Sequence, residues 1–158
     1  IMQGVLNKGV KKVVKPLDKA KENSKRTGDL TVNLFRHEFA CKCGCGFNTI
    51  DLALPKVIQD TVNYFQERNP SKCIGVKINS GARCKSHNKK VGGSKKSQHL
   101  IGKAADIVLY DKLSNRTVSA DRVAEYFIQK FPESHGIGRY KSRTHIDVRK
   151  RKARWDLR

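Results

Sequence analysis

The run from Ser97 to Asp106 constrains the fold most, because it places His99 seven residues before an aspartate in an apolar stretch. Gly102 lies between the two and tolerates the positive φ that a tight turn needs. The apolar residues 104–109 then predict a buried strand. We therefore expect His99 on the loop before this strand and Asp106 on the strand itself, with both side chains meeting at one point.

A second histidine completes a set of ligand-type residues. His145 opens another short strand, residues 145–149. Two histidines and an aspartate suit a catalytic Zn²⁺, which uses three protein ligands and keeps its fourth position open. Chance alone can also supply such a trio. Asp106 strengthens the metal interpretation, because a carboxylate in an apolar strand is costly unless it is paired or metal-bound.

Further residues agree, in order, with the pattern of a known family. They are Ser-Gly-Ala-Arg-Cys at 80–84, His-Asn at 87–88, Val-Gly-Gly-Ser at 91–94, Ser-x-His-x-x-Gly-x-Ala-Ala-Asp at 97–106, Gly-Ile-Gly-Arg-Tyr at 136–140, His-Ile-Asp-Val-Arg at 145–149 and Ala-Arg-Trp at 153–155. Over residues 33–155 this pattern closely resembles the M15 family of zinc D-Ala-D-Ala carboxypeptidases, and it looks most like the branch found in phage endolysins.

The resemblance implies a ligand set and a substrate. It implies that His99, Asp106 and His145 bind zinc and that the substrate is the peptide stem of bacterial peptidoglycan. It also implies substrate-binding roles for Arg83 and Ser97, and the guanidinium of an arginine suits a carboxylate because the two pair through parallel hydrogen bonds. The alternatives are a surface ion pair for Arg83 and a turn residue bonded to its own backbone for Ser97.

The general base is less well determined. Several M15 members place Glu or Asp three residues before the last histidine ligand, where this chain has Ser142. Asp147 is the nearest carboxylate, and residues two apart on a strand share a face, so it points the same way as His145. We predict that Asp147 is the catalytic base. The alternatives are that Asp147 orients His145 or pairs with Arg149.

Charge narrows the class of partner. The chain has 34 Lys and Arg against 14 Asp and Glu, a net charge of +20, which indicates a polyanionic partner. Anionic polymers of a bacterial wall satisfy this through the basic surface. We expect no specific nucleic-acid binding, because the aromatic residues are not interleaved with the basic ones. No run is apolar enough to span a membrane and no signal peptide is visible, so we expect a phage-released or virion-borne protein that acts at the cell wall or periplasm.

The pattern predicts one α+β domain over residues 33–158: a mostly antiparallel sheet with helices packed on it, as in the hedgehog and D-Ala-D-Ala-peptidase folds that the resemblance implies. Helices are expected near 54–68 and 119–131, and strands near 73–79, 104–110, 136–140, 145–149 and 153–155. Residues 1–32 look like a separate basic arm or linker, which could attach the chain to a virion or tail assembly.

Three of the five cysteines are clustered as Cys41, Cys43 and Cys45, and Cys84 follows. One interpretation is a structural metal site with Cys84 and His87 as further ligands. The other is a set of buried or turn thiols, since a free cysteine packs as a small hydrophobe. The Cys-x-Cys spacing is tighter than zinc fingers use and favours the second interpretation slightly.

Together these features predict a zinc peptidase of the peptidoglycan stem. It would cut a D-Ala–D-Ala terminus or an internal L-Ala–D-Glu bond, as a phage or prophage endolysin or a virion-associated lysin. The alternative is a non-catalytic virion, tail or wall-binding protein that retains the fold. The serine at position 142, in place of an acid, keeps that alternative open.

Overall fold

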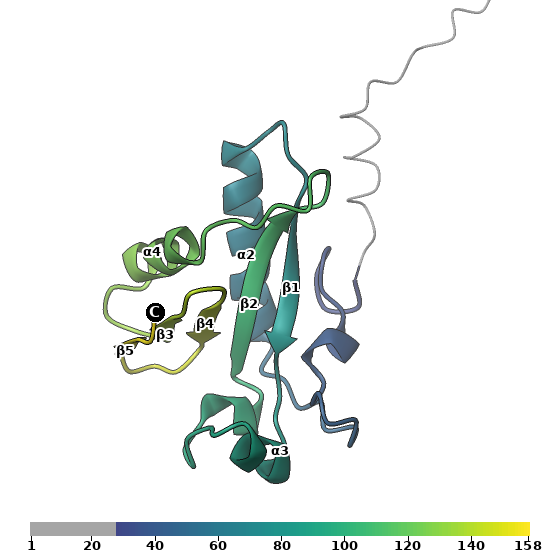
Figure 1. Cartoon of the computed structure of the whole chain (residues 1–158), viewed down its shortest axis with the longest axis vertical. Helices are drawn as coiled ribbons and strands as arrows, with labels where there is room; N and C mark the ends of the chain where they lie inside the picture. The colour runs from purple at the N-terminus through teal and green to yellow at the C-terminus, as the bar shows by residue number, and fades with distance from the viewer. Residues whose placement is uncertain (1–27) are drawn as a thin grey trace, which may run out of the picture.

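The computed structural model describes residues 28–158, which form an α+β domain as the sequence predicted (Figure 1). The predicted basic arm covers 1–32, and its first 27 residues lie outside the described residues. The last residues of that arm contact the domain, because the Thr31 hydroxyl donates to Gln59 Oε1 at 2.7 Å. None of the helices in the described part of the chain is long and apolar enough to cross a membrane.

The sheet of the described domain has the strand order β1-β2-β4-β3-β5. β1 (Ile74–Ser80) pairs with β2 (Ala104–Asp111), β2 with β4 (Thr144–Asp147), and β4 with β3 (Gly136–Arg139), all in antiparallel fashion. β5 (Ala153–Asp156) joins β3 in parallel at the edge. The prediction of a mostly antiparallel sheet is therefore confirmed, with one parallel pair that the sequence did not indicate.

Three α-helices and two 3₁₀ helices accompany the sheet in residues 28–158. α2 (Ala53–Arg68) packs on β1, and α4 (Ala120–Lys130) packs on β3 and β4. The short α3 (Lys85–Lys90) lies beyond the end of the sheet where β1 ends and β2 begins (Figure 1). The 3₁₀ helices are η1 (Arg36–Phe39) and η2 (Gln98–Ile101), and η2 leads directly into β2.

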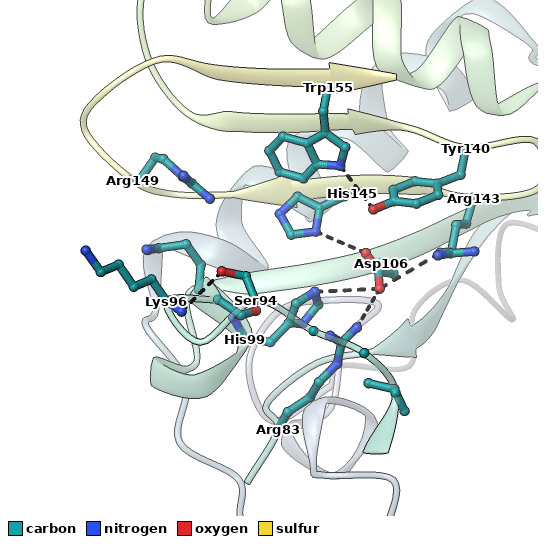
Figure 2. Close-up of a pocket in the computed structure, with 15 residues that line it drawn as sticks. Arg83, Ser94, Lys96, His99, Asp106, Tyr140, Arg143, His145, Arg149 and Trp155 are labelled. Carbon is teal, nitrogen blue, oxygen red and sulfur yellow. Dashed lines mark hydrogen bonds and ion pairs between the residues drawn. The ribbon is translucent and has the colours of Figure 1, made fainter. Parts of the chain in front are cut away.

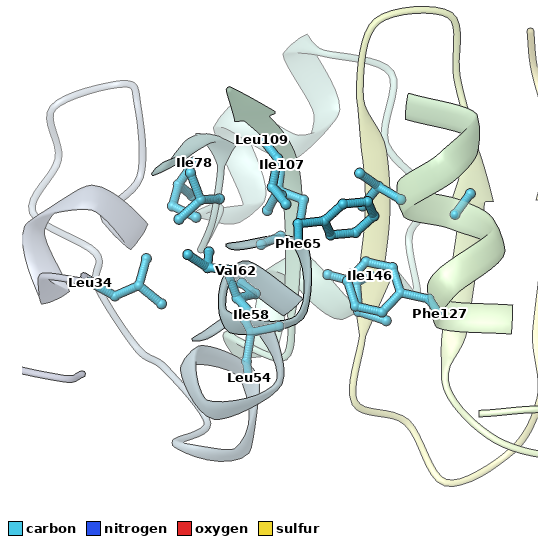
Figure 3. Close-up of a cluster of buried hydrophobic side chains, with 14 of the residues drawn as sticks. Leu34, Leu54, Ile58, Val62, Phe65, Ile78, Ile107, Leu109, Phe127 and Ile146 are labelled. Atoms are coloured by element: carbon cyan, nitrogen blue, oxygen red, sulfur yellow. The ribbon is translucent and has the colours of Figure 1, made fainter. Parts of the chain in front are cut away.

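The hydrophobic core lies between the sheet and the helices α2 and α4 (Figure 3). Side chains alternate along a strand, so Ile107 and Leu109 of β2 are buried in this core while Asp106 points to the opposite face. Burial of each large apolar side chain contributes roughly 1.5–3 kcal/mol. The buried apolar residues that the two helices supply are Leu54, Ile58, Val62, Phe65, Val123 and Phe127. The core thus occupies one face of the sheet and leaves the other face for polar groups.

Candidate metal centre and substrate pocket

Three ligand-type side chains meet on the face of the sheet opposite to the core. They are His99, Asp106 and His145, and each offers a ligand atom that lies within 4.8 Å of the other two. The three residues are 2%, 5% and 5% exposed. The structure therefore brings together all three residues that the sequence named as ligands, which we call the His–Asp–His group (Figure 2).

Strand register and one turn position this group. Asp106 of β2 and His145 of β4 are directly opposite each other in an antiparallel pair, so their side chains share a face. His99 lies in η2, which ends at Gly102 with φ +69°. A Cβ at Gly102 would collide with the backbone oxygen of Thr49, so both the conformation and the space require glycine. The expected glycine turn between His99 and Asp106 is confirmed.

Each histidine uses one ring nitrogen to fix its orientation and turns the other toward Asp106. The Nδ1 of His99 is 2.7 Å from the carbonyl oxygen of Gly81, and its Nε2 is 3.6 Å from Asp106 Oδ2. The Nε2 of His145 is 2.9 Å from Asp147 Oδ2, and its Nδ1 is 3.1 Å from Asp106 Oδ1. A neutral imidazole that donates through one nitrogen keeps a lone pair on the other. Metal-binding histidines typically donate their second ring nitrogen to a carbonyl or carboxylate in this way, and we call that group the outer partner.

The charges within the group stabilise one another. Burial would raise the pKa of the Asp106 carboxyl, but hydrogen bonds from His145 and His99 hold that pKa well below its usual range. Burial would lower the pKa of His145, but hydrogen bonds to Asp106 and Asp147 raise it above its ordinary value. Arg83 Nη2 also pairs with Asp106 Oδ2 at 3.0 Å. Two imidazoles and a buried carboxylate whose donor atoms lie this close together are a ligand set that fits a divalent cation such as Zn²⁺.

Asp147 lies behind His145 rather than beside the open side of the group. It is 0% exposed and both of its carboxylate oxygens accept hydrogen bonds. Oδ1 accepts from the backbone of Gly136 at 3.0 Å and from Arg149 Nε at 2.7 Å, while Oδ2 accepts from Arg149 Nη2 at 2.7 Å and faces His145 Nε2. The geometry thus favours the orienting role over the predicted catalytic role.

The reason lies in strand geometry. Residues two apart on a strand share a face, but a rise of about 3.3 Å per residue separates them by nearly 7 Å. The shared face of His145 and Asp147 therefore did not place both at the same distance from Asp106.

A pocket opens over the His–Asp–His group, and both predicted substrate-binding residues, Arg83 and Ser97, line it. Arg83 Nε donates to Ser80 Oγ at 2.9 Å, which orients the guanidinium. The Ser97 hydroxyl accepts a hydrogen bond from the backbone of His99 at 3.3 Å. Ser97 therefore also forms the turn that the sequence analysis gave as its alternative role. Among the described residues that line the pocket, Asp106 is the only carboxylate.

Several lining residues were given no role in the pocket by the sequence reasoning. They are Lys96, Tyr140, Arg143, Arg149 and Trp155. Arg143 Nε lies 4.0 Å from Asp106 Oδ2, and the Trp155 indole donates to Tyr140 Oη at 3.0 Å beside the ring of His145 (Figure 2). Two signals were available: the motif runs that contain Tyr140, Arg149 and Trp155, and the basic residues that flank His145 on both sides. The pocket is therefore strongly basic apart from its one buried acid.

A family model described as Peptidase M15 matches residues 32–147. The match covers more than half of the chain and includes the whole His–Asp–His group, together with Arg83 and Asp147. No curated protein matches the chain. The family model thus agrees with the likeness that the motif residues carried up to Asp147, and the chain belongs to the peptidase M15 family.

Proposed function

We propose that the chain is a zinc-dependent peptidase that hydrolyses the peptide stem of bacterial peptidoglycan. The observation that supports this most is the buried His–Asp–His group, in which each histidine is held by an outer partner and turns its other nitrogen toward Asp106. Membership of the peptidase M15 family supports peptide-bond hydrolysis as the reaction.

The residues of the group would hold the zinc through His99 Nε2, His145 Nδ1 and the carboxylate of Asp106. A bound zinc ion polarises a carbonyl and lowers the pKa of water toward 7. The carbonyl of Gly81 and the carboxylate of Asp147 keep the two imidazole rings in place, so the donors stay oriented before any ligand arrives.

The basic lining supports an anionic substrate. Arg83, Lys96, Arg143 and Arg149 all line the pocket. The peptide stem of peptidoglycan carries free carboxylates, and a guanidinium binds a carboxylate through two parallel hydrogen bonds. Arg83 is the best placed of the four, because Ser80 orients it and its Nη2 reaches the group at Asp106. We assign Arg83 to a carboxylate of the stem, next to the bond that is cut.

Beyond the pocket, the net charge of +20 supports attraction to anionic wall polymers, which would concentrate the enzyme at its insoluble substrate. We propose on the same basis that the protein acts at the bacterial cell wall or periplasm and that a phage or virion delivers it.

One observation favours a second candidate function. The described pocket residues include no carboxylate besides Asp106, and Asp147 has both of its oxygens engaged. No free carboxylate is therefore left among the described pocket residues to accept a proton from the attacking water. A wall-binding or virion protein that keeps the fold and the ligands without turnover would have such a pocket.

The test is hydrolysis of purified peptidoglycan together with metal content, for the wild type and the His99→Ala variant. We expect the wild type to release fragments and His99→Ala to lose both the release and one equivalent of zinc. His37→Ala is the matched control, because His37 is an exposed histidine outside the pocket. Free alanine among the products would identify a carboxypeptidase, and stems that begin with D-Glu would identify an endopeptidase. Zinc bound through His99 without hydrolysis of any wall type would support the second candidate instead.

A further inference from the structure

Four cysteines from two distant segments meet near the surface. Cys41, Cys43 and Cys45 follow η1, and Cys84 precedes α3. Their sulfur atoms all lie within 4.8 Å of one another, and all four are thiols rather than disulfides. The sequence slightly favoured separate turn thiols at these positions. The structure instead gathers them into one group, which we call the thiol cluster.

The distances within the cluster suit a metal. The sulfur of Cys43 lies 3.4 Å from that of Cys41 and 3.7 Å from that of Cys84. In a tetrahedral site with Zn–S bonds of about 2.3 Å, neighbouring sulfurs lie about 3.8 Å apart. A disulfide would need about 2.05 Å. The two separations at Cys43 are therefore close to the edge of such a tetrahedron, and the remaining sulfurs lie within 4.8 Å of one another.

Backbone groups are arranged as they are around thiolates. The backbone N–H of Cys84 donates to Cys41 Sγ, and that of His87 donates to Cys84 Sγ, each at 3.4 Å. Hydrogen bonds to the charged form of a group favour that form. His87 thus takes part through its backbone, and the fourth sulfur comes from Cys45. The interpretation in which the His87 ring is a ligand is therefore not what the structure shows.

The loop conformation explains how so tight a spacing can work. Gly44 and Gly46 have φ of +81° and +85°, a region that favours glycine, and the backbone of Cys41 donates to the carbonyl of Phe47 at 2.7 Å. The loop therefore folds back on itself. Zinc fingers usually have two to four residues between paired ligands. Here a single residue between the cysteines is enough, because the two glycines reverse the direction of the chain.

The cluster also joins two parts of the domain. Phe39, just before the cysteine loop, accepts a hydrogen bond from the backbone of Ala82 at 2.7 Å. Residues 81–84 carry the carbonyl that holds His99 and the guanidinium that reaches Asp106. An ion at the sulfurs would fix this loop from outside the pocket.

We propose that Cys41, Cys43, Cys45 and Cys84 bind a second zinc ion in a closed, structural site. Four thiolates fill the coordination sphere, so the site has no open position for substrate, in contrast to three-ligand catalytic sites. Binding requires the thiols to lose their protons, and no oxidation or reduction is involved. Lys42 and Lys85 adjoin the ligands in sequence and offset part of the negative charge.

Cobalt substitution tests the proposal, because only thiolate ligands give an intense thiolate-to-cobalt charge-transfer band. The full chain is purified under reducing conditions, its zinc is counted, and Co²⁺ is then exchanged in. We expect two equivalents of zinc and a strong charge-transfer band in the wild type. His145→Ala should lose one equivalent and keep the band, whereas Cys84→Ser should lose one equivalent together with the band.

Cys73→Ser is the matched control, because Cys73 lies outside the cluster and directly precedes β1. This variant should keep both metals. Cys43→Ser is the second variant should Cys84→Ser not fold, since Cys43 is exposed and its loss leaves no cavity. A wild type without the band, or a band that survives both serine variants, would overturn the proposal. An intact mass that shows disulfides among these cysteines after purification under reducing conditions would overturn the proposal as well. Hydrolysis that persists without the band would leave the peptidase function standing.

Discussion

Strand β2 carries a buried carboxylate near each of its ends. Asp106 is 5% exposed and Asp111 is 7% exposed. Asp111 accepts hydrogen bonds from the backbone of Cys73 at 3.0 Å and of Leu113 at 3.1 Å, and from the Ser114 hydroxyl at 2.8 Å. Asp106 instead faces two histidines and an arginine beneath a pocket.

The difference teaches that burial of a carboxylate does not mark a functional site by itself. The cost of placing a carboxylate in an apolar strand is met at both ends of β2. At Asp111 the partners are the backbone of Cys73 just before β1 and groups of the turn that follows β2, which hold these segments together. At Asp106 they are groups that bind metals and anions. The chemistry of the partners therefore separates the two, and replacing each aspartate by asparagine tests that separation directly.

The largest effect is expected from Asp106→Asn. The amide supplies a weak metal ligand and points N–H donors at histidine nitrogens that should carry lone pairs. We expect peptidase activity to fall by more than about 100-fold, beyond what loss of an outer partner alone costs, and one equivalent of zinc to be lost. Peptidoglycan hydrolysis and metal content measure this. Asp111→Asn is the control and should keep both; if the two variants behaved alike, the comparison would fail.

Asp147→Asn should have a smaller effect, about 10–100-fold on activity, with a parallel decrease in zinc affinity. The reason is that Asp147 acts on the pocket through His145, and an amide oxygen can replace only part of the carboxylate that holds that ring. Kinetics combined with chelator competition for zinc would measure both. A catalytic base would give a different pattern, in which turnover disappears while zinc affinity stays unchanged.

Arg83→Lys tests whether Arg83 acts on the substrate, whereas the two histidines that face Asp106 act on the metal. Lysine keeps the charge but loses the forked geometry. Hydrogen bonds to charged groups contribute about 1.5–3 kcal/mol, so we expect KM to rise by roughly 10-fold, with zinc content unchanged. Steady-state kinetics on a soluble stem peptide is the measurement. An unchanged KM would mean that Arg83 serves only as the counter-charge of Asp106.

Much of the fold could be predicted because its signals are local. The apolar run of residues 104–109 predicted the strand that carries Asp106. Helical spacing of apolar residues predicted α2 and α4, and Gly102 predicted the turn that returns His99 to the strand. The group of three ligand-type residues followed from this turn, from the residue types that suit Zn²⁺ and from the resemblance of the motif residues.

The remainder depends on contacts between distant segments. The parallel edge strand β5 depends on its register with β3, and the basic residues over the pocket come from segments beside β1, η2 and β4 that are far apart in the sequence. The thiol cluster joins residues 41–45 to Cys84, and no spacing rule spans that separation. The distance of Asp147 from the open side of the group likewise depends on the position along the strand, which a shared face does not specify.

Asp111→Asn should have the smallest effect, and it concerns stability and pH rather than activity. The hydrogen bond from the Cys73 backbone holds the pKa of Asp111 below its ordinary value. The unfolded chain therefore binds this proton more readily, so the stabilisation is fully present above the unfolded pKa of about 3.9. It is lost as pH falls through the folded-state pKa.

We expect Asp111→Asn to lower Tm at pH 7 by a few degrees, on the order of 2–4 °C. The gap to the wild type should narrow as pH falls below about 3.9, because the unfolded wild-type chain then takes up a proton. Thermal unfolding across this pH range measures the effect. Asp60→Asn is the control, because Asp60 makes only a long surface ion pair with Lys130, at 3.9 Å, and such pairs contribute little. A gap that stayed constant with pH would show that the turn is held by shape rather than by charge, and Asp111 would then differ from Asp106 even more than the hydrogen bonds indicate.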